Sequence, residues 1–248
     1  MEVVARRGPG GRTVLPVVQA SGQLAVRRTG PTTVHLVATA FGPLGGDDAE
    51  LRLVVEDGAR LAVRSVAASV VLPARGSSPP SVQRVRAEVA GALDLRLEPT
   101  VVTAGAQHRA LLHALLDDDA ELAATEQVQL GRTGEQPGRW TGSTRVERAG
   151  VPLLHTTVGL GPGAAAWLPP VAPTAYASTV QLGPATAAVT AMAAVTAAAA
   201  AGRAVGDDAV RLPLPGGWVA TAWGDRLTPT LRRLAALDRP AAVLEVVP

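Results

Sequence analysis

Short runs of alternating apolar and polar residues, separated by tight turns, recur at intervals of roughly thirty residues through the first two-thirds of the chain. The turns between these runs are Asp57-Gly58-Ala59-Arg60-Leu61, Ala90-Gly91-Ala92-Leu93-Asp94-Leu95 and Asp118-Asp119-Ala120-Glu121-Leu122. A unit that repeats at a fixed period buries its apolar face against the next unit, which is typical of solenoids. The spacing therefore predicts a mainly β fold, a solenoid-like (β-helicoid) stack of strands.

The residues around the first turn indicate which side chains face the core. Leu51, Leu53 and Val55 alternate with more polar neighbours before the turn, and Leu61 and Val63 do so after it. Successive side chains of a strand point to opposite sides of the sheet. We therefore expect these five side chains to share one core.

Two glycine-containing turns, Asp57-Gly58 and Ala149-Gly150, fit hairpins between such strands. Glycine has no Cβ and adopts positive φ at little cost, which short hairpin turns require. Both pairs are therefore predicted to be hairpin turns.

The last third of the chain changes character. We expect a single domain over residues 1–248, with the β body at about 12–182, a helix at about 184–201, strands at about 205–223 and a second helix at about 227–238. Pro184 and Gly202 bracket an Ala-rich stretch as the first turn and the end of a capped helix would. Alanine inserts poorly into membranes, so this stretch predicts a soluble helix and no membrane partner.

The absence of lysine and cysteine excludes several chemistries. All 23 basic residues are arginine, so a P-loop lysine and a Schiff-base amine are missing. Without cysteine there is no thiol catalysis and no thiolate metal site, which fits a reducing cytoplasm. The N-terminal residues show no secretory signal, and a cytoplasmic location is expected.

The sequence pI of about 10.2 does not indicate a nucleic-acid partner. With no lysine and one tyrosine, almost nothing titrates between histidine and arginine, and the formal charge is only +2. Arginines are dispersed and aromatic residues make up 2% of the chain, too few for a base-stacking platform. We expect no nucleic-acid binding.

Four histidines are the strongest transition-metal ligands of the sequence. His108 and His113 are five residues apart, so they lie on opposite faces of a strand. His35 and His155 stand in apolar, strand-like runs that favour hydrogen-bonded structural histidines. The spacing argues against a permanent, tightly bound metal cofactor.

Several motifs, in this order and spacing, resemble the urease accessory protein D family (UreD, also called UreH). They are Gly42-Pro43-Leu44-Gly45-Gly46-Asp47, Asp57-Gly58-Ala59-Arg60-Leu61-Ala62-Val63, Glu98-Pro99 with Gly105-Ala106, and Glu126 followed by Gly131-Arg132-Thr133-Gly134-Glu135. One stretch departs from the family: where relatives run Thr-Thr-Gln-Ala-Ala-Thr-Lys-Val-Tyr, this chain has Val66, Val70 and Leu72 in place of Gln, Lys and Tyr. The resemblance implies a β body with two late helices and no enzyme activity.

The resemblance also implies a function, a cargo and partners. It implies a urease maturation factor, a scaffold that binds apo-urease, a UreF-like helical accessory protein and a UreG-like GTPase, and assists nickel insertion. Nickel(II) would pass transiently through an internal, water-filled route. The residues that match the family motifs and carry suitable ligand groups for this route are Asp47, Glu98, His108, Glu126 and Glu135.

Each of these carboxylates also has a simpler interpretation. Asp47 is suited to fixing a turn, Glu98 to ending a strand before Pro99, and Glu126 and Glu135 to pairing with Arg132 or Arg139 on a solvated face.

Arg132 and Trp140 are candidate partner contacts, as is Trp167. A core position is equally open for the tryptophans. Two other classes of function stay open: a β-solenoid protein-binding module of an unrelated pathway, and a hydrolase that uses Glu126 and Glu135 as paired acids.

Overall fold

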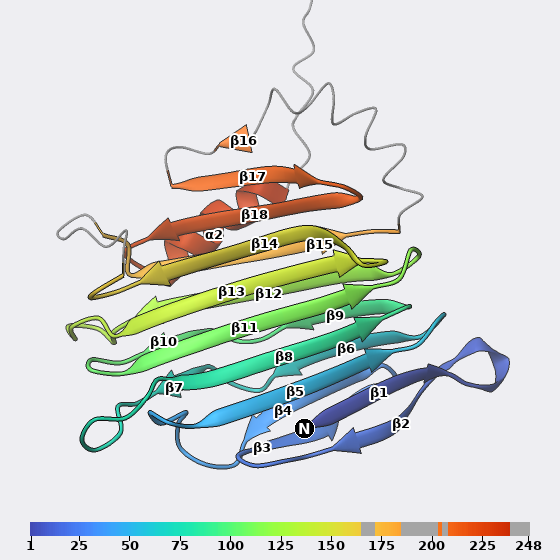
Figure 1. Ribbon diagram of the computed structural model, residues 1–248, viewed down its shortest axis with the longest axis horizontal. Coiled ribbons are helices and arrows are strands. Elements are labelled where there is room, and N and C mark those ends of the chain that lie inside the picture. Colours follow the sequence, from blue (N-terminus) through green and yellow to red (C-terminus); the bar gives the residue numbers. More distant parts are fainter. Residues whose placement is uncertain (165–171, 185–202, 205–207, 239–248) are drawn as a thin grey trace, which may run out of the picture.

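The computed structural model describes residues 1–164, 172–184, 203–204 and 208–238, and the structural statements below concern this part of the chain. Two β-sheets lie face to face as a solenoid-like stack of about four turns (Figure 1). The mainly β, solenoid-like fold predicted from the sequence is confirmed.

Sheet A has seven strands in the order β14-β13-β11-β8-β5-β1-β2. Their bounds are β1 Glu2–Arg7, β2 Thr13–Gln19, β5 Asp48–Val55, β8 Ser81–Val89, β11 Gln107–Leu116, β13 Arg139–Arg148 and β14 Val151–Leu160. A short 3-10 helix, η1 (Pro9–Gly11), joins the first two strands. Strand β1 shows that the β body begins at Glu2 and not at about residue 12.

Sheet B has eleven strands: nine in the order β16-β17-β18-β15-β12-β9-β6-β4-β3, then β10, which pairs with β12, and β7, which pairs with β10. Their bounds are β3 Leu24–Arg28, β4 Thr33–Ala38, β6 Arg60–Ser65, β7 Ser69–Val71, β9 Ala92–Arg96, β10 Thr100–Val102, β12 Glu121–Leu130, β15 Ala175–Leu182, β16 Arg203–Ala204, β17 Ala209–Leu214 and β18 Gly217–Gly224.

Between β5 and β13 the chain alternates between the two sheets, and the short strands β7 and β10 extend its passage through sheet B. It runs β5, β6, β8, β9, β11, β12, β13, so that consecutive sheet A strands pair in parallel, and so do consecutive sheet B strands. Antiparallel pairs close the stack at its ends, such as β1 with β2 and β13 with β14. This alternation explains the roughly thirty-residue period.

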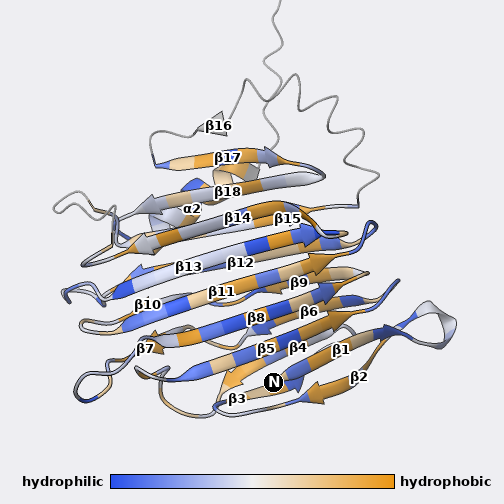
Figure 2. Cartoon of the chain, in the orientation of Figure 1, coloured by the Kyte–Doolittle hydropathy of each residue, from blue (hydrophilic) through white to orange (hydrophobic). Residues whose placement is uncertain are grey.

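The space between the sheets holds the main core. Leu51, Leu53 and Val55 of β5 and Leu61 and Val63 of β6 are all buried there, as the alternation predicted. Their neighbours in sequence face outward, and the strands in Figure 2 accordingly alternate between polar and apolar residues. The period-two pattern therefore assigned the buried face of these strands correctly.

The two glycine turns differ in kind. Ala149-Gly150, with φ of 47° and 79°, closes the antiparallel hairpin between β13 and β14, as predicted. Gly58 also has a positive φ, 64°, but its turn connects β5 of sheet A to β6 of sheet B. The hairpin prediction for Asp57-Gly58 was wrong, because a solenoid corner needs the same tight, left-handed backbone as a hairpin.

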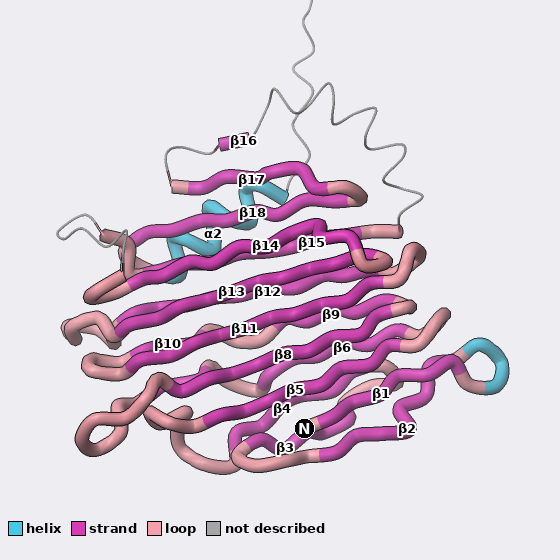
Figure 3. The backbone as a smooth tube through the Cα atoms, viewed as in Figure 1, coloured by secondary structure: helices cyan, strands magenta, loops and turns pink. Residues whose placement is uncertain are grey.

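One helix, α2 (Leu227–Asp238), lies against the outer face of sheet B behind β18 (Figure 3). Leu234 and Leu237 pack onto the small side chains Ala177, Ala220 and Ala222. Helix α2 lies where the second helix was predicted, and β17 and β18 lie in the region predicted to hold two late strands. Trp167 lies outside the described residues. So does the helix predicted at 184–201, except for residue 184.

The outer face of sheet A is covered by ion pairs between neighbouring parallel strands. Arg52 of β5 lies 2.8 Å from Glu2 of β1 and 3.0 Å from Glu88 of β8. Such exposed pairs are screened by solvent and contribute little, so the core carries most of the stability. No helix of the described residues is long and apolar enough to cross a membrane.

Candidate functional site

A cavity of about 80 Å³ lies between the two sheets, where the core changes from apolar to polar. This inter-sheet cavity is larger than the roughly 10–15 Å³ that one water molecule requires. Its polar lining comes from both sheets and consists of Gln83, Glu98, Thr100, Thr125, Glu126, Gln127, Thr144 and Ser178.

Glu126 is the acidic side chain in the inward-facing row of β12. Along this strand Leu122, Ala124, Val128 and Leu130 occupy the other inward positions, and all four are buried. Glu126 pairs in register with Ser178 of β15, which also lines the cavity. The carboxyl group therefore stands between two apolar clusters.

The surroundings of Glu126 disfavour its charged form. Desolvation raises the pKa of the carboxyl from 4.5 to about 8. The residue keeps some accessible surface, in accord with its position in the cavity lining. Glu126 is thus mostly protonated at neutral pH.

Gly142 on β13 makes room for this group. A Cβ atom at this position would lie 2.3 Å from Cη2 of Trp140 and 2.9 Å from Oε2 of Glu126. Such distances are too short for any side chain to be accommodated without movement. The missing side chain at Gly142 therefore lets the indole ring and the carboxyl group approach each other.

Aromatic residues form the apolar wall on one side of Glu126. Trp140 is completely buried, and its ring centroid lies 5.3 Å from that of Tyr176. Burial, and next the nearby Glu126, raise the pKa of Tyr176 to about 12. Trp140 is thus a core residue, the second interpretation that the sequence left open, and its ring offers no surface to a partner.

His108 lies beside Trp140 in the register of β11 and β13, and only 2% of it is exposed. Its Nδ1 is 2.9 Å from Oγ of Ser81, whose hydroxyl also lies within donating distance of the Gln107 carbonyl. Burial lowers the pKa of His108 to about 4, so the ring is neutral. Its Nε2 has no hydrogen-bond partner in the described structure. His113 points to the outer face of the sheet, where its Nε2 lies 3.2 Å from Oε1 of Glu147. The two histidines thus lie on opposite faces of the strand, as predicted.

The remaining predicted residues lie at or beyond the ends of the strands. Oδ2 of Asp47 accepts a hydrogen bond of 2.8 Å from the backbone N–H of Leu44, so this side chain fixes its turn. Glu98 is exposed and lines the inter-sheet cavity, where it forms part of the mouth. Glu98 and Glu126 are thus brought to one cavity.

Glu135 is held in the loop after β12 by Arg132. Its carboxylate accepts hydrogen bonds from Nε and from the backbone N–H of Arg132, both at 2.9 Å. This contact lowers the pKa of Glu135 to about 2. Neither Glu135 nor Asp47 lines the inter-sheet cavity, and the pairing of Glu126 with Glu135 that a hydrolase would need is not formed.

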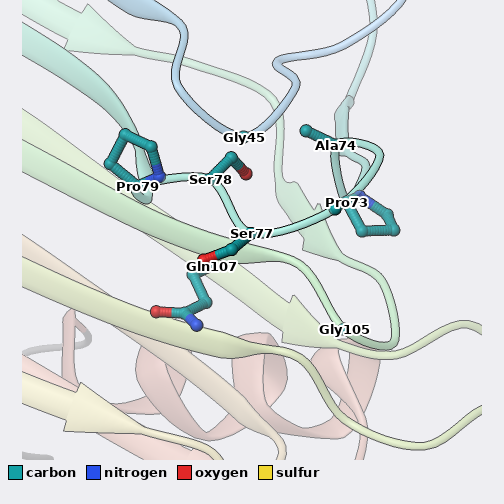
Figure 4. Close-up of a pocket in the computed structure, with 9 residues that line it drawn as sticks. Gly45, Pro73, Ala74, Ser77, Ser78, Pro79, Gly105 and Gln107 are labelled. Atoms are coloured by element: carbon teal, nitrogen blue, oxygen red, sulfur yellow. The ribbon is translucent and has the colours of Figure 1, made fainter.

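A second cavity, of about 150 Å³, lies at the loop end of the stack. Figure 4 shows Ser77, Ser78 and Gln107 around it, with Gly45 and Gly105 closing its sides. Its lining contains no ionisable group. Across the described residues, no three histidine or acidic side chains come together in a way that would hold a metal ion.

The sequence prediction missed the six neutral polar residues of the site, Gln83, Thr100, Thr125, Gln127, Thr144 and Ser178. Their signal was present, because Thr144 shares the inward row of β13 with the buried Trp140 and Val146. A polar residue in an apolar row marks an interior polar site. Glu126 shows the same pattern on β12.

Comparison with known proteins adds an independent finding. The family model for the UreD urease accessory protein matches residues 1–243. A urease accessory protein UreD of Frankia alni is 40% identical over 229 residues, covering 84% of this chain and 74% of the relative. Another from a Parafrankia species is 38% identical over 258 residues, covering 92% and 83%. The chain with this polar cavity between two solenoid sheets therefore belongs to the UreD family of urease accessory proteins.

Proposed function

We propose that this protein assists the maturation of urease as a non-catalytic scaffold. Its partners would be apo-urease, a helical accessory protein and a GTPase. The relatives are named accessory proteins and not enzymes, which agrees with the expectation that this chain makes and breaks no bonds. Because the chain has no lysine for a phosphate-binding loop, nucleotide hydrolysis would be the task of a partner.

We further propose that the inter-sheet cavity is a stretch of the route taken by Ni(II). The observation that carries this proposal is Glu126, a carboxyl group in the inward row of a solenoid core. Placing an acid there costs stability, since desolvation acts on it with no compensating cation. A function for the carboxyl explains why a smaller apolar residue does not fill the position.

The ligand set suits passage and not storage. Glu126 supplies one carboxylate, while Gln83, Thr144 and Ser178 supply neutral oxygen or amide groups. Nickel binds such groups less strongly than imidazole. The ion must also displace the proton of Glu126, and a pKa of about 8 lowers the apparent affinity at pH 7 by about tenfold. The cavity would therefore release the ion readily.

Glu98 would collect the ion at the mouth, and Glu126 would receive it inside. His108 has a neutral ring with an unpartnered Nε2, which is a suitable third ligand, but it lies in the apolar wall around Trp140. Asp47 and Glu135 already fix backbone turns and are left out of the route.

Co-expression tests the maturation role. Urease subunits and the remaining accessory proteins are produced with and without this chain in one nickel-supplemented medium, and the nickel content and activity of the purified urease are measured. We expect nickel-poor, inactive urease only when the chain is omitted. Equal nickel content in both preparations would contradict the proposed function.

A further inference from the structure

The only phenylalanine of the chain is almost fully exposed. Phe41 stands in the loop between β4 and β5, and 92% of it is accessible. A phenyl ring buries 150–250 Å² when it is covered, so leaving it in water forgoes a large stabilisation. Single exposed apolar residues are common, and the neighbours of Phe41 decide what the exposure means.

Three further exposed apolar side chains lie on the adjoining corner of the solenoid. Leu44 forms a bridge with Leu72, next to β7, and the N–H of Val66 donates to the carbonyl of Leu36 at the end of β4. The loop after β4 and the turn between β6 and β7 thus lie side by side. We name the patch of Phe41, Leu44, Val66 and Val70 the apolar corner; their exposures are 92%, 38%, 62% and 37%.

The two segments that form the apolar corner are themselves uncharged and are flanked by Asp47, Arg64 and Arg75. Neither residues 37–46 nor residues 65–74 include an acidic or basic residue, whereas ion pairs cover the outer face of sheet A. An anionic membrane surface or a nucleic acid would call for arginines here. Charge depletion with exposed apolar and aromatic residues is instead the composition of the core of a protein interface.

The apolar corner lies next to the mouth of the inter-sheet cavity. The backbone N–H of Glu98, a cavity-lining residue, donates to Oγ of Ser65 at 2.8 Å, and Ser65 precedes Val66. A protein seated on the corner would cover the mouth and exclude bulk water from it.

We propose that the apolar corner is the docking surface for the protein that exchanges Ni(II) with the inter-sheet cavity, a partner with an uncharged contact face and an apolar pocket that receives the ring of Phe41. This inference rests on the proposed function. A second copy of this chain is the alternative occupant, which the experiment below distinguishes. The partner would make the rest of its contact with residues around the mouth of the inter-sheet cavity.

The inference is tested by co-purification. The tagged chain is co-expressed with one partner at a time, namely apo-urease, the helical accessory protein or the GTPase, and the amount of partner that co-purifies is measured. We expect Phe41→Ala and Val66→Asp to weaken binding of one of the three proteins at least about tenfold, as interface anchors do. Val151→Asp is the matched control, since Val151 is 61% exposed on the hairpin between β13 and β14. Unchanged circular dichroism and thermal midpoints would show that all variants are folded.

Wild-type binding of all three partners by both corner variants would overturn the docking surface while leaving the proposed function intact. A wild-type chain that binds none of the three would overturn both. If the chain forms a concentration-dependent dimer and Phe41→Ala abolishes it, the corner binds a second copy of the chain. That result would also contradict the inference.

Discussion

Glutamine in place of Glu126 is expected to stabilise the protein above neutral pH and to remove the loss of stability that ionisation of this carboxyl group causes as the pH rises. The pKa of Glu126 is about 8 in the folded state and near 4.5 in the unfolded chain. Between these values the folded state binds more protons, so the free energy of unfolding falls as the pH rises. Over pH 5 to 8 the loss that this carboxyl group causes is about 2–3 kcal/mol after allowance for partial exposure.

Urea unfolding at pH 5, 6, 7 and 8 measures this effect. The free energy of unfolding of Glu126→Gln minus that of wild type should increase across the series, while the contribution of the buried His108 is common to both proteins. Glu121→Gln provides the control, since Glu121 lies on the same strand with its side chain 46% exposed. Parallel pH profiles of wild type and Glu126→Gln would mean that the carboxyl group is not desolvated.

Replacement of Trp140 by alanine is expected to lower the free energy of unfolding by about 3–5 kcal/mol. The indole is completely buried, packs against Tyr176 and belongs to the smaller core cluster with Val128 and Leu130. A loss of this size is a large share of the roughly 5–15 kcal/mol that stabilises a typical protein. Much of the variant should therefore be unfolded or insoluble at 37 °C.

The urea midpoint followed by circular dichroism, together with the soluble fraction on expression, tests this prediction. Trp218→Ala is the matched control, because Trp218 is partly exposed and its ring is covered by the guanidinium of Arg211 at 4.3 Å. A Trp140→Ala protein with a wild-type midpoint would contradict the core assignment. If Trp140→Ala keeps its stability but no longer binds a partner, Trp140 is an interface anchor.

Much of the fold followed from local pattern. The alternation of Leu51, Leu53 and Val55 assigned the buried face because strand side chains alternate strictly. The turn glycines were placed correctly, but tight turns of similar sequence join either hairpin partners or two sheets. The difference between Asp57-Gly58 and Ala149-Gly150 depends on where the following strand pairs, which is a long-range property.

The candidate site was only partly accessible from sequence. Glu98 and Glu126 were named among the acidic residues, yet the sequence alone gave Glu126 and Glu135 equal standing. Their difference arises from register: Glu126 falls in the inward row of β12, whereas Glu135 lies in the loop beyond it beside Arg132. Gln83 and Ser178 join the cavity from strands far apart in the chain, a proximity that no local pattern shows.

The apolar corner was also visible in part. Val66, Val70 and Leu72 stood out as apolar replacements of polar family residues, but their meaning depended on exposure. Val71, between two of them, is completely buried, while Val66 and Val70 face outward. The approach of the loop that carries Phe41 to this segment could not be read from the sequence, because the bridge of Leu44 with Leu72 joins residues that are far apart in the chain.

The nickel content of urease matured with Glu126→Ala tests the central claim most directly. The variant, wild type, Glu98→Ala and the control Glu135→Ala are each co-expressed with urease and the other accessory proteins, and each is checked for wild-type recovery in the co-purified complex. If the cavity carries Ni(II), the complex with Glu126→Ala forms normally but delivers urease with several-fold less nickel than Glu135→Ala does, with Glu98→Ala in between. Full nickel content with Glu126→Ala would contradict a route between the two sheets.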